Sequence, residues 1–104
     1  MADRIGKVEF EEKVLKSTLP VLVDFYSDSC IACKKLAPAL SQVEELLGDR
    51  FYFYKVNTDY EGGLTEEYEI LSGPTLIVFI NGKERERKAG AQKPQELIDW
   101  LKSF

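Results

Sequence analysis

Hydrophobic and polar positions along this chain follow helical and strand periods in turn. Residues 8–17 place Phe10 and Val14 at helical spacing, and Pro20 ends that predicted helix. Residues 21–26 are apolar at nearly every position, which is typical of a strand covered on both faces of its sheet. The pattern therefore predicts a helix followed by a buried strand.

The longest predicted helix covers residues 30–47. Asp28 and Ser29, both good N-cap residues, precede it, and Gly48 ends it. Pro38 lies within the helix and cannot donate to its hydrogen-bond ladder, so we expect a kink there. The apolar face, at steps of three and four residues, comprises Leu36, Leu40, Val43, Leu46 and Leu47.

Residues 51–57 predict an interior strand with aromatic side chains on both faces. We expect the aromatic run at residues 51–54, and Trp100, to pack in the core, because no basic groove accompanies them as a stacking platform would require. A glycine pair at 62–63 breaks the chain, and a short polar helix follows over residues 64–69.

The last third of the chain predicts a hairpin and a final helix. Residues 75–80 and 83–88 form two strands joined by Asn81-Gly82, a two-residue hairpin signal, and the charged second strand lies at the sheet edge. Pro94 begins the helix, whose apolar stripe is Leu97, Ile98, Leu101 and Phe104. The order βαβ then ββα predicts an α/β fold with a central mixed sheet of four to five strands covered by about four helices.

Composition adds limits on size and location. The 104 residues suit a single domain over residues 1–104, and the net charge of -4, with both signs interspersed, gives no footprint for nucleic acid or an anionic membrane. The apolar run at residues 76–80 is far short of the roughly 20 residues that span a bilayer. Residues 1–4 carry no signal region, so we expect a cytoplasmic protein.

The two cysteines, Cys30 and Cys33, stand at the start of the long helix directly after a buried strand. Their spacing lets one sulfur attack an external disulfide while the other resolves the mixed disulfide. Cys30 meets the unpaired N–H groups and the positive end of the helix dipole, which favour a thiolate. We therefore assign Cys30 as the nucleophile and Cys33 as the buried resolving thiol.

Two other functions stay open at this point. A dimer could bridge zinc or an iron–sulfur cluster through four thiolates, two from each chain, since one chain has no histidine and a single cysteine pair. A non-catalytic adaptor could also use the same fold to bind another protein.

Asp24 interrupts the apolar strand between Val23 and Phe25. An ionised, unpaired carboxylate buried there costs several kcal/mol, so we expect burial to raise the pKa of Asp24 and to make it usable as an acid or base. The alternative is an Asp24 that faces water or pairs with Lys55.

The segment VDFYSDSCIACKKLAP at residues 23–38 resembles the active-site stretch of the thioredoxin family. Similar family motifs are matched by Lys55-Val56-Asn57, Gly73-Pro74-Thr75, Asn81-Gly82-Lys83 and Gly90. The resemblance covers nearly the whole chain. It implies the thioredoxin fold and a thiol–disulfide oxidoreductase that reduces protein disulfides.

The departures from the family lie at the site. Where thioredoxins usually carry Trp-Cys-Gly-Pro-Cys, this chain has Ser29-Cys30-Ile31-Ala32-Cys33. Tyr26 replaces the other active-site Trp, and Gly73 replaces the usual branched residue. Because the two residues between the cysteines bring no charge and no ring, we expect a reductant rather than an oxidant. The surface that partners meet, near Ile31, Ala32, Gly73 and Gly90, should also be altered in shape.

The resemblance also implies roles for single residues. Asp24 would assist deprotonation of Cys33, with Lys55 as a partner of Asp24. Pro74 would follow a cis peptide bond that sets the Gly73 backbone against the cysteine pair, where a peptide substrate can hydrogen-bond. Supporting positions would be Tyr26, Ser29, Lys55 and Pro38.

The resemblance and the sequence together indicate the reaction partners. No bound cofactor or metal is implied, and the redox group is the Cys30–Cys33 disulfide itself; a Gly-x-Gly-x-x-Gly element is lacking. The implied electron donor is a flavoprotein similar to thioredoxin reductase, and the implied substrates are proteins that contain disulfides. We expect the protein to act as a monomer.

Overall fold

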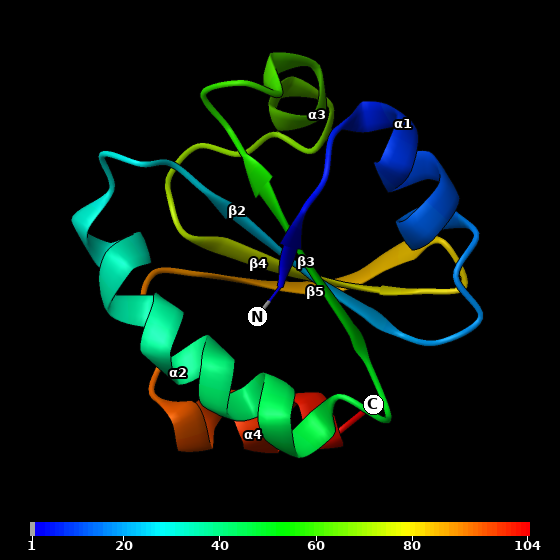
Figure 1. The fold of residues 1–104 in the computed structure, drawn as a ribbon, viewed down its shortest axis with the longest axis vertical. Coiled ribbons are helices and arrows are strands. Elements are labelled where there is room, and N and C mark those ends of the chain that lie inside the picture. Colours follow the sequence, from blue (N-terminus) through cyan, green and yellow to red (C-terminus); the bar gives the residue numbers. More distant parts are fainter. Residues whose placement is uncertain (1) are drawn as a thin grey trace.

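A computed structural model describes residues 2–104 as a five-stranded mixed sheet with helices on both faces (Figure 1). The strands, which lie in the order β1-β3-β2-β4-β5, are β1 (Asp3–Arg4), β2 (Val21–Tyr26), β3 (Tyr52–Asn57), β4 (Thr75–Ile80) and β5 (Lys83–Ala89). The helices are α1 (Lys7–Phe10), its π-helical continuation η1 (Glu11–Leu15), α2 (Ile31–Leu47), α3 (Gly62–Glu67) and α4 (Pro94–Lys102). Strands β1, β3 and β2 are parallel to one another, β4 pairs antiparallel with β2, and β5 pairs antiparallel with β4. The predicted fold class is confirmed.

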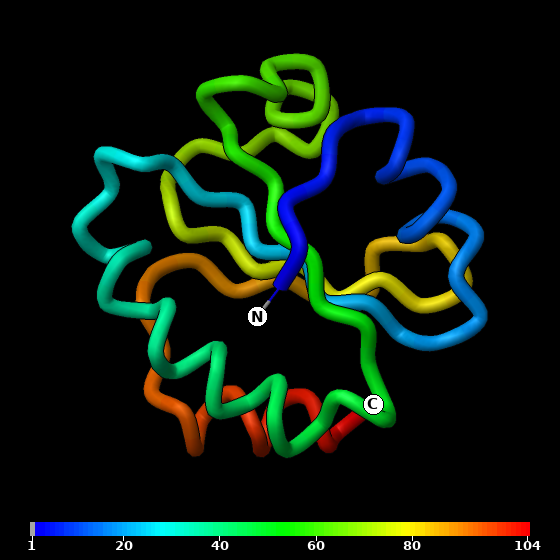
Figure 2. The backbone as a smooth tube through the Cα atoms, viewed as in Figure 1, coloured from blue at the N-terminus to red at the C-terminus, as the bar shows by residue number. Residues whose placement is uncertain are grey.

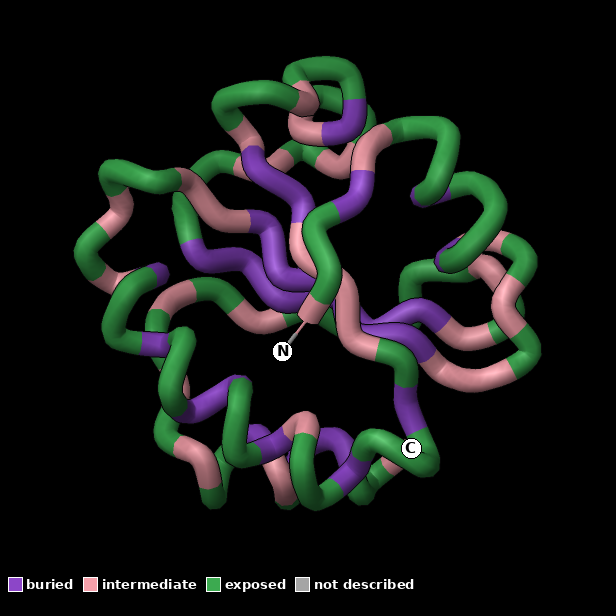
Figure 3. Tube along the Cα trace, viewed as in Figure 1, coloured by how far each residue is buried: buried purple, intermediate pink, exposed green. Residues whose placement is uncertain are grey.

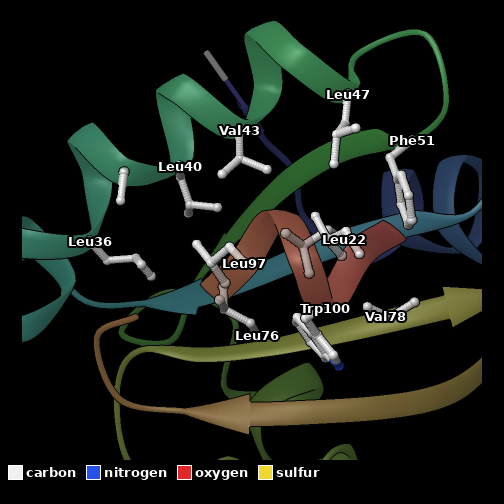
Figure 4. Close-up of a cluster of buried hydrophobic side chains, with 12 residues drawn as sticks. Leu22, Leu36, Leu40, Val43, Leu47, Phe51, Leu76, Val78, Leu97 and Trp100 are labelled. Carbon is white, nitrogen blue, oxygen red and sulfur yellow. The ribbon is translucent and has the colours of Figure 1, made fainter. Parts of the chain in front are cut away.

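Strand β2 is buried along most of its length (Figure 3). Its side chains alternate between the two faces of the sheet, so each face has its own core. Leu22 packs beneath α2 and α4 with Leu36, Val43, Leu97 and Trp100 (Figure 4). The opposite face joins α1, η1 and α3 through Phe10, Val14, Val21, Val23, Phe25, Leu64 and Phe79. Asp24, two positions beyond Leu22 on β2, therefore lies on the face that α2 covers.

Two local predictions were wrong in detail, and one short strand was missed. The glycine pair at 62–63 does not break the chain before α3 but forms its first turn, where helical N–H groups need no intrahelical partner. Strand β1 was not predicted, because two residues show no periodicity. Tyr52, the first residue of β3, is 44% exposed rather than in the core.

Some features of the charged and terminal segments were predicted correctly. Strand β5 is the charged edge strand, and Trp100 is buried with its Nε1–H donating to Glu86 Oε1 at 2.9 Å.

None of the helices in residues 2–104 has both the length and the apolar character that a membrane-spanning helix needs.

The hairpin between β4 and β5 depends on left-handed backbone at Asn81 (φ 53°) and Gly82 (φ 77°). A Cβ at Gly82 would collide with the Leu15 carbonyl oxygen of η1. Gly82→Ala should therefore lower the free energy of unfolding by about 1–3 kcal/mol, which urea unfolding would measure. The matched control is Gly63→Ala, because a Cβ at Gly63 meets nothing within 4 Å. Equal unfolding midpoints for the two variants would contradict the prediction.

Candidate active site

Three loops meet at one end of the sheet: the loop before α2, the loop before β4 and the loop after β5 (Figure 2). The backbone N–H of Gly90, at φ 89°, donates to the Pro74 carbonyl oxygen at 2.8 Å and so joins the last two loops. The Gly73–Pro74 peptide bond is cis. The structure thus brings Cys30, Gly73, Pro74 and Gly90, far apart in the sequence, to one site.

The two cysteines form a disulfide at the start of α2. Cys30 is itself the N-cap, with its Sγ accepting the Cys33 backbone N–H at 3.1 Å, so the expectation that Asp28 or Ser29 caps a helix opened by Cys30 was wrong. Cys33, in the first turn, is only 6% exposed, while Cys30 is partly accessible to solvent. This asymmetry gives an external molecule a path to Cys30 but not to Cys33.

Gly73 lies directly against the disulfide. A Cβ built on Gly73 would sit 3.0 Å from Cys33 Sγ and 3.3 Å from Cys30 Sγ. Both separations are shorter than ordinary van der Waals contact, so even a methyl group would require the sulfurs or the loop to move. Thioredoxins usually carry a branched residue where this chain has Gly73. The glycine allows the backbone to approach both sulfurs closely.

Asp24 is a buried carboxyl on β2, 8% exposed, and its Oδ1 has no hydrogen-bond partner. Burial raises the pKa of Asp24 to about 7; Lys55 opposes this by attraction, and Glu44 adds a smaller upward effect. Among the described residues, Asp24 forms no ion pair with Lys55 within 4.0 Å. The alternatives of a water-facing or directly paired Asp24 therefore do not describe this structure.

A cavity of about 210 Å³ connects Asp24 with Cys33 beneath α2. Its wall also contains two predicted supporting residues, Tyr26 and Lys55, whose Nζ lies 5.3 Å from the centre of the Tyr26 ring. Sequence reasoning missed further wall residues, namely Ala2, Ser27, Asp28, Lys34, Ala37, Leu40, Ser41 and Glu44. The available signal was helical spacing, because Ala37, Ser41 and Glu44 follow Cys33 at steps of three and four residues.

The remaining predicted site residues lie outside this cavity wall. Ile31 is 72% exposed beside Cys30, and Ala32 is partly buried. Ser29 and Pro38 are exposed, and neither belongs to the cavity wall in residues 2–104. Helix α2 continues through Pro38, and the kink expected there stays a prediction. Within the same residues, no three or more His, Cys, Asp or Glu side chains are grouped to hold a metal ion.

Comparison with known proteins agrees with this geometry. The family model described as thioredoxin matches residues 3–103. A thioredoxin of Rickettsia felis is 37% identical over 97% of this chain and 96% of its own length, and a thioredoxin of Rhodospirillum rubrum is 33% identical over 96% of each. Thioredoxin Y, chloroplastic, of Oryza sativa is 39% identical over 90% of this chain and 56% of its own length. With its paired cysteines on this fold, the chain belongs to the thioredoxin family of thiol–disulfide oxidoreductases.

Proposed function

We propose that this protein reduces disulfides of other proteins, with Cys30 as the attacking thiolate and Cys33 as the resolving thiol. The observation that carries the proposal is the asymmetric disulfide at the start of α2, where Cys30 is reachable and Cys33 is buried. The helix N-terminus stabilises negative charge on Cys30 once the pair is reduced.

The exchange transfers two electrons in two steps. The Cys30 thiolate bonds to one sulfur of the substrate disulfide, and the other substrate sulfur leaves as a thiolate. The Cys33 thiolate then attacks Cys30 Sγ, which releases the second substrate thiolate and leaves the Cys30–Cys33 disulfide. Substrate is reduced, and the protein is oxidised to the state seen here.

Asp24 fits the role of a base for Cys33. Both residues line the same cavity, and burial raises the pKa of Asp24 to about 7, so its carboxyl changes charge near neutral pH. The cavity provides a route for the Cys33 proton, either directly or through water, when the second step requires a Cys33 thiolate.

The cycle needs an external electron donor. The redox-active disulfide serves as the only redox group in this proposal, and a flavoprotein reductase of the thioredoxin reductase class returns it to the dithiol. The substrates are proteins whose disulfides reach Cys30 past Ile31 and Gly73, both exposed at the site. We place this cycle in the cytoplasm and assign it to a monomer.

The test is insulin-disulfide reduction with dithiothreitol as the donor, on metal-free protein. The control is the same protein reduced and treated with iodoacetamide, which modifies the accessible Cys30 before the buried Cys33. We expect rapid insulin precipitation only with untreated protein. No acceleration over dithiothreitol alone, by folded and reduced protein, would contradict the function; bound metal at one ion or cluster per two chains would instead favour the bridged dimer.

Gly73→Ala should slow reduction of protein disulfides about tenfold, because misplacing the reacting sulfurs by a fraction of an ångström lowers the rate steeply. The reason is the separation of 3.0 Å that the new methyl would have from Cys33 Sγ. The measurement is kcat/KM for insulin, with Gly63→Ala as the matched control. Equal kcat/KM values for both variants and the wild type would show that the close approach of Gly73 has no kinetic role.

A further inference from the structure

Lys55 lines the cavity, where both the Asp24 carboxyl and the Tyr26 ring can attract its ammonium group. Strands β2 and β3 pair with Asp24 directly opposite Lys55, and Tyr26 follows on the same face of β2 two positions later. All three side chains line the cavity. Lys55 Nζ is positioned 5.3 Å from the centre of the Tyr26 ring, a favourable cation–π distance.

Lys55 does not form an ion pair with Asp24 in the part of the chain that the structure describes. Its Oδ1 is buried and has no hydrogen-bond partner, and in residues 2–104 no ion pair within 4.0 Å joins Asp24 to Lys55. The Lys55 ammonium nonetheless acts on Asp24 through space by attraction. The lysine therefore lies within electrostatic range of the carboxyl but is engaged by the aromatic ring.

We propose that Tyr26 is a positioning residue whose ring holds the Lys55 ammonium and so prevents direct contact between Lys55 and the Asp24 carboxyl. A direct contact would be a charge-assisted hydrogen bond, which favours the ionised carboxylate. By competing for the ammonium, the ring leaves Asp24 able to hold a proton near neutral pH. Any effect of Tyr26 on the rate of disulfide reduction rests on the proposed function, whereas the contact of Lys55 with the Tyr26 ring does not.

Other charged or titratable groups also surround the carboxyl. Helix α2 contributes Cys33, Lys34 and Glu44 to the cavity wall, and the loop before it contributes Asp28. Glu44 raises the pKa of Asp24 by repulsion. These groups remain the same in all the variants below, so differences between variants report the Tyr26–Lys55 pair.

The test is a titration of the Asp24 carboxyl carbon by NMR in the oxidised protein, where Cys30 and Cys33 are joined and do not titrate. Tyr26→Leu removes the aromatic face, and we expect its Asp24 midpoint to fall by about one pH unit as Lys55 turns to the carboxylate. Tyr26→Phe keeps the face and should titrate as the wild type. Lys55→Met should raise the midpoint, because it removes the attraction.

The double variant Tyr26→Leu/Lys55→Met decides the cause. It should titrate as Lys55→Met alone, since the ring acts only through the ammonium. A Tyr26→Leu midpoint that is unchanged or raised, or that falls equally in the Lys55→Met background, would overturn the proposal. If Tyr26→Leu does not fold, Tyr26→Trp replaces it: the indole binds an ammonium better, so a fall in its midpoint would overturn the proposal and an equal or higher midpoint would support it. Because no variant is scored by turnover, failure here is distinguishable from failure of the reductase function.

Discussion

Cys30→Ser should lower the rate of insulin reduction by roughly a thousandfold or more, because a serine hydroxyl does not replace a thiolate nucleophile. Cys33→Ser should lose turnover as well, but for a different reason. Its Cys30 can still attack, so the variant should accumulate a mixed disulfide that no second thiol resolves. The two single variants thus have the same activity and different products.

Intact-mass spectrometry after reaction with oxidised glutathione distinguishes the two products. Cys33→Ser should gain one glutathione on Cys30, quickly, and peptide mapping would locate it. Cys30→Ser should gain it far more slowly, because its remaining thiol, on Cys33, is only 6% exposed in the wild-type structure. Faster labelling of Cys33 than of Cys30 would reverse the assigned roles.

The buried strands and the hairpin were predictable because local signals agree there. Strand β4 has the predicted bounds: a continuous apolar run lies between Gly73-Pro74 and Asn81-Gly82. The hairpin residues adopt the left-handed conformations that their types allow, with φ 53° and 77°. Propensity, periodicity and turn chemistry therefore all indicate one structure.

Strand β1 and the exposure of Tyr52 were not predictable from such signals. The two residues of β1 are exposed, and they pair with a segment of β3 some fifty positions later. Their conformation is thus set by tertiary pairing. Tyr52 has the alternation of a core aromatic, but its exposure depends on which side chains the tertiary fold packs over the start of β3.

The candidate site divides in the same way. Cys30, Cys33 and Asp24 could be found because each departs from its surroundings, as a cysteine pair at a helix start or a carboxylate in an apolar strand. Glu44 and Ser41 follow Cys33 at helical spacing, but that signal alone does not single them out, because polar residues on an amphipathic helix usually face water. Only the packing of α2 over β2 brings them to the cavity beside Asp24.

Asp24→Asn should stabilise the protein increasingly as the pH rises from about 4 to about 8. The pKa of Asp24 is raised by burial from 3.8 to about 7, so between these values the folded protein binds a proton that the unfolded chain has released. Stability from this group is therefore full below pH 3.8 and is lost as the pH rises through 7. The loss amounts to about 4 kcal/mol at 1.36 kcal/mol per pH unit. Because asparagine does not ionise, the Asp24→Asn variant does not lose this stability as the pH rises.

Urea unfolding of the oxidised proteins between pH 4.5 and 8 measures this effect without thiol titration. The difference in unfolding free energy between Asp24→Asn and wild type should grow with pH, whatever constant cost the buried amide adds. The control is Asp49→Asn, at an exposed carboxyl in the turn after α2, which should give a curve parallel to the wild type. A pH-independent difference for Asp24→Asn would mean that its carboxyl is not held protonated.

The same substitution should slow disulfide reduction at neutral pH, by roughly a hundredfold if Asp24 acts as the base for Cys33. A base must be ionised, so wild-type turnover should rise as the pH passes about 7, and Asp24→Asn should lack that rise. Glutathione labelling of Cys30 tests the step, because that attack precedes the one that needs Cys33. If Asp24→Asn and wild type are labelled at equal rates while the variant turns over more slowly, Asp24 acts in the resolving step. An equal slowing of labelling and turnover would exclude a role specific to that step. Together, the two results would show that Asp24 destabilises the fold at neutral pH and accelerates the resolving step. The burial of Asp24 would then serve the reaction at a cost in stability.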